Sequence, residues 1–249
     1  MRKHSISQPD AQNRRVADAP DHSLDLRTTY DHDFPVVATV YRYSDGTMEM
    51  GYSSNNSHKA KHPSLSASAS SDNSGRTTVR AKSFVRRLVL TMGGKALLTL
   101  TYRENQTDYN QAKKHFQDFA RRARRHFGTF RYVAVSETQK CGAWHFHVVL
   151  DRYYRANDIR AIWEHGNIDL QKVRSAKSAA RYLTKYLSKT FDGEWPANEP
   201  RYLRSRNIKL NTEKHTFENT HQALDHFHKM TEGIHEYHWE KDGNGFITT

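Results

Sequence analysis

The pattern of apolar and polar positions changes character near residue 79. Before that point the chain is polar and without regular period, and 53–78 consists largely of Ser, Asn, Lys and Gly. Within it, 35–52 predicts two short strands around an Asp-Gly pair, which favours a hairpin turn. We therefore expect residues 1–75 to be a polar, largely disordered region that contains a short β-hairpin.

From Val79 onwards the apolar positions follow helical and strand periods in turn. Predicted helices end before Gly93-Gly94 or cover 110–127, 156–164, 175–189 and 219–230. Predicted strands cover 96–102, 130–137, 144–150, 167–173 and 201–210. Helices mixed with strands predict one α+β domain over 76–249.

Two neighbouring strands place reactive side chains on one face. His145 and His147 are two residues apart, so both imidazoles project to the same side of a strand. If the strands pair as a hairpin centred on Cys141, Glu137 lies opposite His145 on that side. Two imidazoles and a carboxylate can hold a divalent cation. The alternative is a pair of surface histidines in a chain that contains 16 of them.

The helix predicted over 175–189 segregates two kinds of side chain. At about 100° per residue, its alanines and leucines fall in one arc, which can dock on the sheet. A separate arc holds Tyr182, Lys185, Tyr186 and Lys189. The alternative interpretation is an exposed basic helix with incidental tyrosines.

Together these two features predict nucleophilic chemistry. A phenol has a pKa of about 10 and is a poor nucleophile at neutral pH. A nearby ammonium group and a divalent cation favour the phenolate and offset charge on a phosphate. The combination predicts attack by a tyrosine on a phosphodiester, which leaves a covalent phosphotyrosine.

The charge of the chain points to a polyanionic partner. Lys and Arg total 39 against 27 Asp and Glu, which gives a net charge of +12. Such an excess most often indicates nucleic acid, although solubility or an anionic membrane surface also explains it. Four arginines of the helix at 110–127 are expected to bind DNA phosphates: Arg121, Arg122, Arg124 and Arg125.

Cysteine content and hydropathy narrow the setting. The single cysteine, Cys141, excludes a disulfide framework and a cysteine-based zinc ribbon within one chain. No apolar run approaches the roughly 20 residues that span a bilayer, and the first residues lack the apolar stretch of a secretory signal. We expect a cytoplasmic protein without a membrane partner.

Three segments resemble the motifs of a known superfamily. LLTLTY (97–102), Glu137 with GAWHFHVVL (142–150), and YLTKYLSK (182–189) are similar to motifs I, II and III of the HUH endonucleases, in their usual order. Two tyrosines with a lysine between them resemble the gene A-type rolling-circle replication initiators of small single-stranded DNA phages. RYLRSR (201–206) resembles a basic stretch that follows motif III in phage and plasmid initiators. The resemblance covers roughly 79–210.

The resemblance implies a central antiparallel β-sheet flanked by helices. His145, His147 and Glu137 would bind Mg²⁺ or Mn²⁺. Tyr182 or Tyr186 would nick single-stranded DNA at a replication origin in a bacterial host, hold the 5′ phosphate and free a 3′ hydroxyl for a host DNA polymerase. Strand transfer would later close the product. Lys185 would serve both phenolates, and the DNA-binding residues would include Lys189, Arg201, Arg204 and Arg206.

Several interpretations stay open at this stage. Larger initiators carry a helicase with a GxxxxGKS/T loop, whereas the only Gly-Gly-Lys here, at 93–95, is followed by Ala96, so we expect a host helicase to act with this protein. A two-tyrosine HUH transposase shares the chemistry but usually has a cysteine-rich zinc module. A metal oxygenase leaves the tyrosines and the charge unexplained. A non-enzymatic basic DNA-binding protein leaves the shared His and Glu face unexplained.

Overall fold

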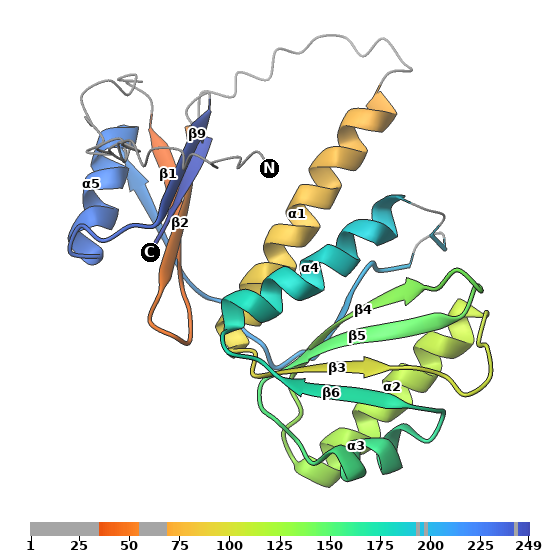
Figure 1. The fold of residues 1–249 in the computed structure, drawn as a ribbon. Helices are drawn as coiled ribbons and strands as arrows, with labels where there is room; N and C mark the ends of the chain where they lie inside the picture. The colour runs from red at the N-terminus through yellow and green to blue at the C-terminus, as the bar shows by residue number, and fades with distance from the viewer. Residues whose placement is uncertain (1–34, 55–68, 193–194, 197–198, 242–243) are drawn as a thin grey trace, which may run out of the picture. The chain divides into compact units, whose positions relative to one another are not determined.

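The computed structural model describes residues 35–54, 69–192, 195–196, 199–241 and 244–249 (Figure 1). The expectation of disorder in residues 1–34 and 55–68 lies outside these ranges. The described part is α+β, with two antiparallel sheets of five strands each and helices packed on them, which confirms the predicted fold class.

The first sheet, here called the central sheet, is the one that carries the predicted motifs. Its strand order is β6-β3-β5-β4-β7, and every neighbouring pair is antiparallel. The strands are β3 (Ala96–Leu100), β4 (Tyr132–Thr138), β5 (Trp144–Leu150), β6 (Ile168–Lys172) and β7 (Leu203–Arg204).

Helices cover both faces of the central sheet, as Figure 1 shows. On one face, α2 (Tyr109–Phe127) and α3 (Ala156–Trp163) pack on a core rich in aromatic residues. On the other face, α1 (Ala69–Met92) and α4 (Ala176–Asp192) pack on a core of valine, leucine and alanine. Alternation along β5 sends Phe146 to the first core, and therefore sends His145 and His147 to the α1–α4 side.

Local sequence explains where these elements begin and end. The side chain of Asp108 accepts hydrogen bonds from the backbone N–H groups of Asn110 and Gln111, which caps the first turn of α2. Gly142 ends the β4–β5 turn with φ of +81°, a conformation that favours glycine, and its N–H donates to the carbonyl of Gln139. This turn fixes the register of β4 against β5.

The second sheet is built from both ends of the described chain. Its order is β8-β1-β2-β10-β9, and α5 (Thr220–Met230) packs on one face. The strands are β1 (Val36–Arg42), β2 (Met48–Ser54), β8 (Asn211–Phe217), β9 (Tyr237–Lys241) and β10 (Asn244–Thr248). The segment at 35–52 thus supplies a hairpin that pairs with C-terminal strands, so strand pairing crosses the expected division at residue 75; the division itself stays a prediction.

The interpretation of 201–210 as one strand is wrong. β7 is only two residues long, and residues 205–210 form a turn and irregular chain before β8. Strands β8, β9 and β10 are absent from the sequence-based assignment. Among the described residues, no helix is long and apolar enough to cross a membrane.

Candidate active site

The β4–β5 hairpin brings Glu137, His145 and His147 to the face of the central sheet that α4 covers. The register pairs Glu137 with His145, as the hairpin argument predicts, and pairs His147 with Val135. The shared face of the three side chains therefore follows from strand alternation and from the position of the turn.

The closest contact in this group joins Glu137 to His147. His147 Nε2 lies 2.8 Å from Glu137 Oε2, and Lys189 Nζ lies 2.5 Å from Glu137 Oε1. His145 turns aside, with its Nδ1 3.2 Å from Nε2 of Gln139. Both oxygens of the carboxylate are thus engaged by a histidine and a lysine.

Helix α4 places both tyrosines against the same imidazole. The hydroxyl oxygen of Tyr182 lies 3.3 Å from His147 Nδ1. The ring of Tyr186 stacks on that imidazole, with 3.5 Å between the ring centroids and 18° between the planes. The two phenol rings are 4.9 Å apart. Leu183 and Leu187, on the opposite side of the helix, are fully buried against the sheet and fix this orientation.

The lysine that reaches the site is Lys189. Besides its ion pair with Glu137, its Nζ lies 5.1 Å from the ring centroid of Tyr186. Lys185 is exposed and is not among the residues that line the cavity beside the tyrosines. The helical projection placed both lysines in one arc with the tyrosines, but only the side chain one turn further along points to the carboxylate.

Burial and hydrogen bonds set the ionisation of these groups. Burial alone raises the pKa of Glu137, but hydrogen bonds from Lys189 and His147 outweigh it and leave that pKa below its ordinary value. Burial lowers the pKa of His147 and of His145, and the Glu137 carboxylate only partly opposes this. Burial raises the pKa of Tyr182 to about 12. At neutral pH the carboxylate is therefore ionised, the imidazoles are neutral and Tyr182 keeps its proton.

Neutral imidazoles and an ionised carboxylate are ligand types that divalent metal ions accept. In the structure, however, Glu137 and His147 contact each other directly, and within the described residues no group of three or more His, Cys, Asp or Glu side chains is arranged to hold a metal ion. Metal binding by Glu137, His145 and His147 stays a prediction, and it requires His147 Nε2 to exchange its contact with Glu137 for the ion.

The cavity beside these groups has a volume of about 950 Å³. Besides the predicted residues it is lined by Thr99, Thr101 and Asp169, and the strand register places Thr99 between His147 and Asp169. The sequence analysis missed these three. The alternating threonines of LLTLTY carry a signal for the first two, because alternate residues of a strand share a face. Asp169 is adjacent only through the sheet.

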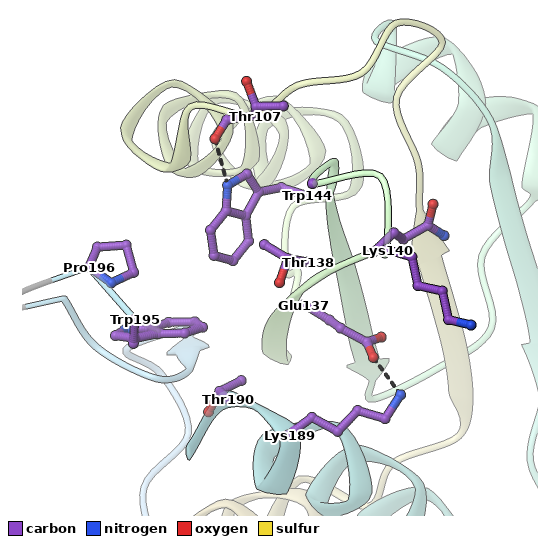
Figure 2. Close-up of a pocket in the computed structure, with 11 residues that line it drawn as sticks. Thr107, Glu137, Thr138, Lys140, Trp144, Lys189, Thr190, Trp195 and Pro196 are labelled. Carbon is purple, nitrogen blue, oxygen red and sulfur yellow. Dashed lines mark hydrogen bonds and ion pairs between the residues drawn. The ribbon is translucent and has the colours of Figure 1, made fainter. Parts of the chain in front are cut away.

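A further cavity of about 660 Å³ shares Glu137 and Lys189 with the first one. Figure 2 shows the indole rings of Trp144 and Trp195 at one end of it and the Lys189 side chain at the other, with Glu137 between them. Neither tryptophan is among the site residues predicted from the sequence.

The structure separates the basic residues predicted to bind DNA. Arg124, Arg204 and Arg206 line a cavity of about 510 Å³ that also includes Tyr132, the first residue of β4. Arg121 pairs with Asp118, while Arg122 pairs with Glu164 and donates to the carbonyl of Ile162. Arg125 is exposed. Arg201 stacks on aromatic rings instead, at 4.5 Å from Phe191 and 5.0 Å from Trp195.

Comparison with known protein families gives a match. Residues 95–191 match the model of a family described as "Replication-associated protein ORF2". This range runs from β3 to the end of α4 and contains the histidines, the glutamate and both tyrosines, although it is less than half of the 249 residues. No curated protein and no solved structure matches the chain. The match supports a replication initiator, and the part of the chain that carries the candidate site is similar to the replication-associated proteins of this family.

Proposed function

We propose that this protein initiates rolling-circle replication by nicking single-stranded DNA at an origin through a tyrosine. The proposed products are a 5′-phosphotyrosine and a free 3′ hydroxyl. A host polymerase would extend the 3′ hydroxyl and a host helicase would separate the strands. The similarity of residues 95–191 to replication-associated proteins supports the process, and the geometry of the site supports the chemistry.

One observation carries the proposed chemistry. Two phenols contact a single imidazole, which is itself bonded to a carboxylate. A nucleophile beside a histidine that a third group orients is the usual arrangement for covalent catalysis. Tyrosines in a structural role would instead pack with the leucines of α4, which face the opposite side.

The covalent step changes two bonds at phosphorus. The tyrosine oxygen forms a bond to the scissile phosphorus, and the bond from phosphorus to the 3′ oxygen breaks. The phenolic proton passes to solvent, and the leaving 3′ oxygen takes up a proton. The ammonium group of Lys189 offsets the negative charge of the phosphate, because it lies beside both Glu137 and Tyr186.

Mg²⁺ or Mn²⁺ held by Glu137, His145 and His147 would polarise the scissile phosphate as a Lewis acid. When Nε2 of His147 is a ligand, the proton of the neutral imidazole is on Nδ1. Nδ1 then donates to the Tyr182 oxygen, 3.3 Å away, and favours the phenolate over a phenol whose pKa burial raises to about 12.

The experiment uses wild-type protein and a pool of single-stranded oligonucleotides tiled across the DNA that flanks its gene. With Mg²⁺ or Mn²⁺ we expect an adduct that survives denaturation, and we expect neither excess EDTA nor His147→Ala to permit it. Binding without any adduct for every oligonucleotide would support a non-enzymatic DNA-binding protein instead. Full cleavage in excess EDTA would contradict the metal site alone.

A further inference from the structure

The cavity with the two tryptophans in Figure 2 is distinct in chemistry from the cavity beside the tyrosines. The tyrosine cavity is lined by His, Glu, Asp, Thr and Lys side chains. The tryptophan cavity has an aromatic end, and it adjoins the other through Glu137, Lys189 and the start of the β4–β5 turn. A molecule can therefore extend from one into the other.

The position of the tryptophan cavity follows from the edge of the central sheet. β7 pairs with β4 only at Val133 and Ala134, so it does not accompany β4 to its C-terminal end. Thr138, the last residue of β4, and Trp144, the first of β5, line the cavity at that end. The cavity connects the edge of the sheet with the face that carries Glu137.

Both indole rings are held in place by groups other than a ligand. The Trp144 N–H donates to the carbonyl of Thr107 at 3.0 Å, and the Trp195 N–H donates to the carbonyl of Glu199 at 3.0 Å. The rings meet at 88° with 5.7 Å between centroids, and Tyr109 contacts both. Because each N–H is already satisfied, the rings offer apolar aromatic surface to whatever enters.

The segment that carries Trp195 is also anchored. Glu199 forms an ion pair with Lys113 of α2, and the Tyr109 hydroxyl donates to the carbonyl of Pro200. The guanidinium of Arg201 lies against the Trp195 ring. Trp195 is nevertheless only half-buried, whereas Trp144 is buried. An anchored but partly open indole is a preformed contact surface.

From these features we infer that the tryptophan cavity binds one nucleobase of the single strand, next to the scissile phosphate. Bases pack on aromatic side chains without a strict sequence requirement, because every base has an aromatic face. Thr138 and Gln139 offer hydrogen-bonding groups to the base edge, and Lys140 and Lys189 offer positive charge to its phosphate. This inference rests on the proposed function, since it assumes a DNA strand at the tyrosines.

The test compares two oligonucleotides in EDTA, which keeps the strand intact. One is a 15-mer of thymidine, at about the upper end of the site sizes of single-strand-binding domains, and the other is an abasic 15-mer with the same phosphates. We expect Trp195→Ala to weaken binding of the thymidine strand about tenfold and to leave the abasic strand unchanged. Trp239→Ala is the matched control, because Trp239 is 44% exposed and lies on β9 of the second sheet.

A second measurement needs no alanine variant at this position. The thymidine strand should quench the tryptophan fluorescence of the wild type, the abasic strand should not, and Trp195→Phe should lose most of the quenching. Equal loss of both strands in Trp195→Ala, or no loss of either, would overturn the base subsite while the adduct experiment still tests the proposed function. Wild-type protein that binds neither strand would overturn both.

Discussion

At the level of single residues, the candidate site depends on His147. Its Nε2 contacts Glu137, its Nδ1 faces the Tyr182 hydroxyl, and its ring stacks on Tyr186. A strand position that is 6% exposed therefore links the carboxylate to both possible nucleophiles. Because the tyrosines differ in their contact with this imidazole, they need not be equivalent in the reaction.

Single substitutions test whether both tyrosines react. Since each phenol lies against His147, we expect Tyr182→Phe and Tyr186→Phe each to retain some single-turnover nicking, and the double variant to form no adduct. The measurement is the yield of denaturation-resistant adduct per enzyme. If one single variant loses all nicking and joining and the other changes nothing, the protein is a one-tyrosine enzyme with a structural neighbour.

The two lysines of α4 provide a matched pair. Lys189 contacts Glu137 and lies near Tyr186, whereas Lys185 is exposed and outside the lining of the cavity. We expect Lys189→Ala to slow adduct formation about 10-fold or more, the scale on which mutation removes a group that stabilises transition-state charge, and Lys185→Ala to slow it much less. A larger loss for Lys185→Ala would restore the role that the family resemblance gives it.

Residue-level prediction from the sequence had a clear limit. Alternation along a strand and one turn position were sufficient to place Glu137 opposite His145. Which histidine bonds the carboxylate was not predictable, because it depends on rotamers and on Lys189 from another element. Trp195 was missed because it lies in a segment between α4 and β7, with no period to mark its partners.

At the level of elements, a buried charge cluster joins β2 to α1. Glu49 of β2 is 1% exposed and accepts hydrogen bonds from Arg86 and Arg87 of α1. The Tyr43 hydroxyl donates to the same carboxylate at 2.7 Å. Burial raises the pKa of Glu49, but the two guanidinium groups outweigh it and the net pKa is lowered.

This cluster predicts a pH-dependent contribution to stability. A carboxyl group with a lowered folded-state pKa stabilises the fold above its unfolded pKa of about 4.3, and that contribution is lost as pH falls through the folded value. We expect Glu49→Gln to cost on the order of 3 kcal/mol at pH 7, because it leaves two arginines without their anion. The difference from wild type should shrink below about pH 4.3.

Denaturant unfolding at several pH values measures this difference. Glu213→Gln is the control, because its pair with Arg42 is exposed and should contribute little. A Glu49→Gln variant as stable as wild type at pH 7, or a difference that grows towards low pH, would contradict the account.

Elements with a strong period were predictable, and those without one were not. α2 and α4 each carry an apolar stripe, and the structure places them at Tyr109–Phe127 and Ala176–Asp192, close to the predicted spans. β8 (Asn211–Phe217) is mostly exposed and polar, so it lacks the alternation that marks a half-buried strand. Its partner β1 is distant in sequence, and such pairing is set by tertiary contacts.

At the level of the whole molecule, the net charge of +12 makes phosphate contacts the expected source of DNA affinity. The arginines are not spread evenly, since Arg124, Arg204 and Arg206 share one cavity. That cavity includes Tyr132, and Glu137 is five residues further along β4, a distance of about 17 Å in a strand. A single strand can contact both regions.

The salt dependence of binding tests this division. Each phosphate neutralised on single-stranded DNA adds about 0.7 to the slope of log affinity against log salt. We expect Arg124→Gln with Arg206→Gln to lower the slope by about 1.4, for all sequences alike, since phosphate contacts carry no base information. Arg121→Gln, whose guanidinium pairs with Asp118, should lower it less. A slope close to zero for the wild type would contradict a phosphate-dominated interface.

The most direct measurement identifies the residue that holds the DNA. Trypsin cleaves after Arg181, Lys185 and Lys189, so the two tyrosines fall in separate peptides, YLTK and YLSK, which differ by one methylene group. After the adduct is digested with nuclease and trypsin, mass spectrometry should find a nucleotide on one or both of these peptides and on no other. A nucleotide attached elsewhere, or an adduct that survives in the Tyr182→Phe, Tyr186→Phe double variant, would contradict the central claim.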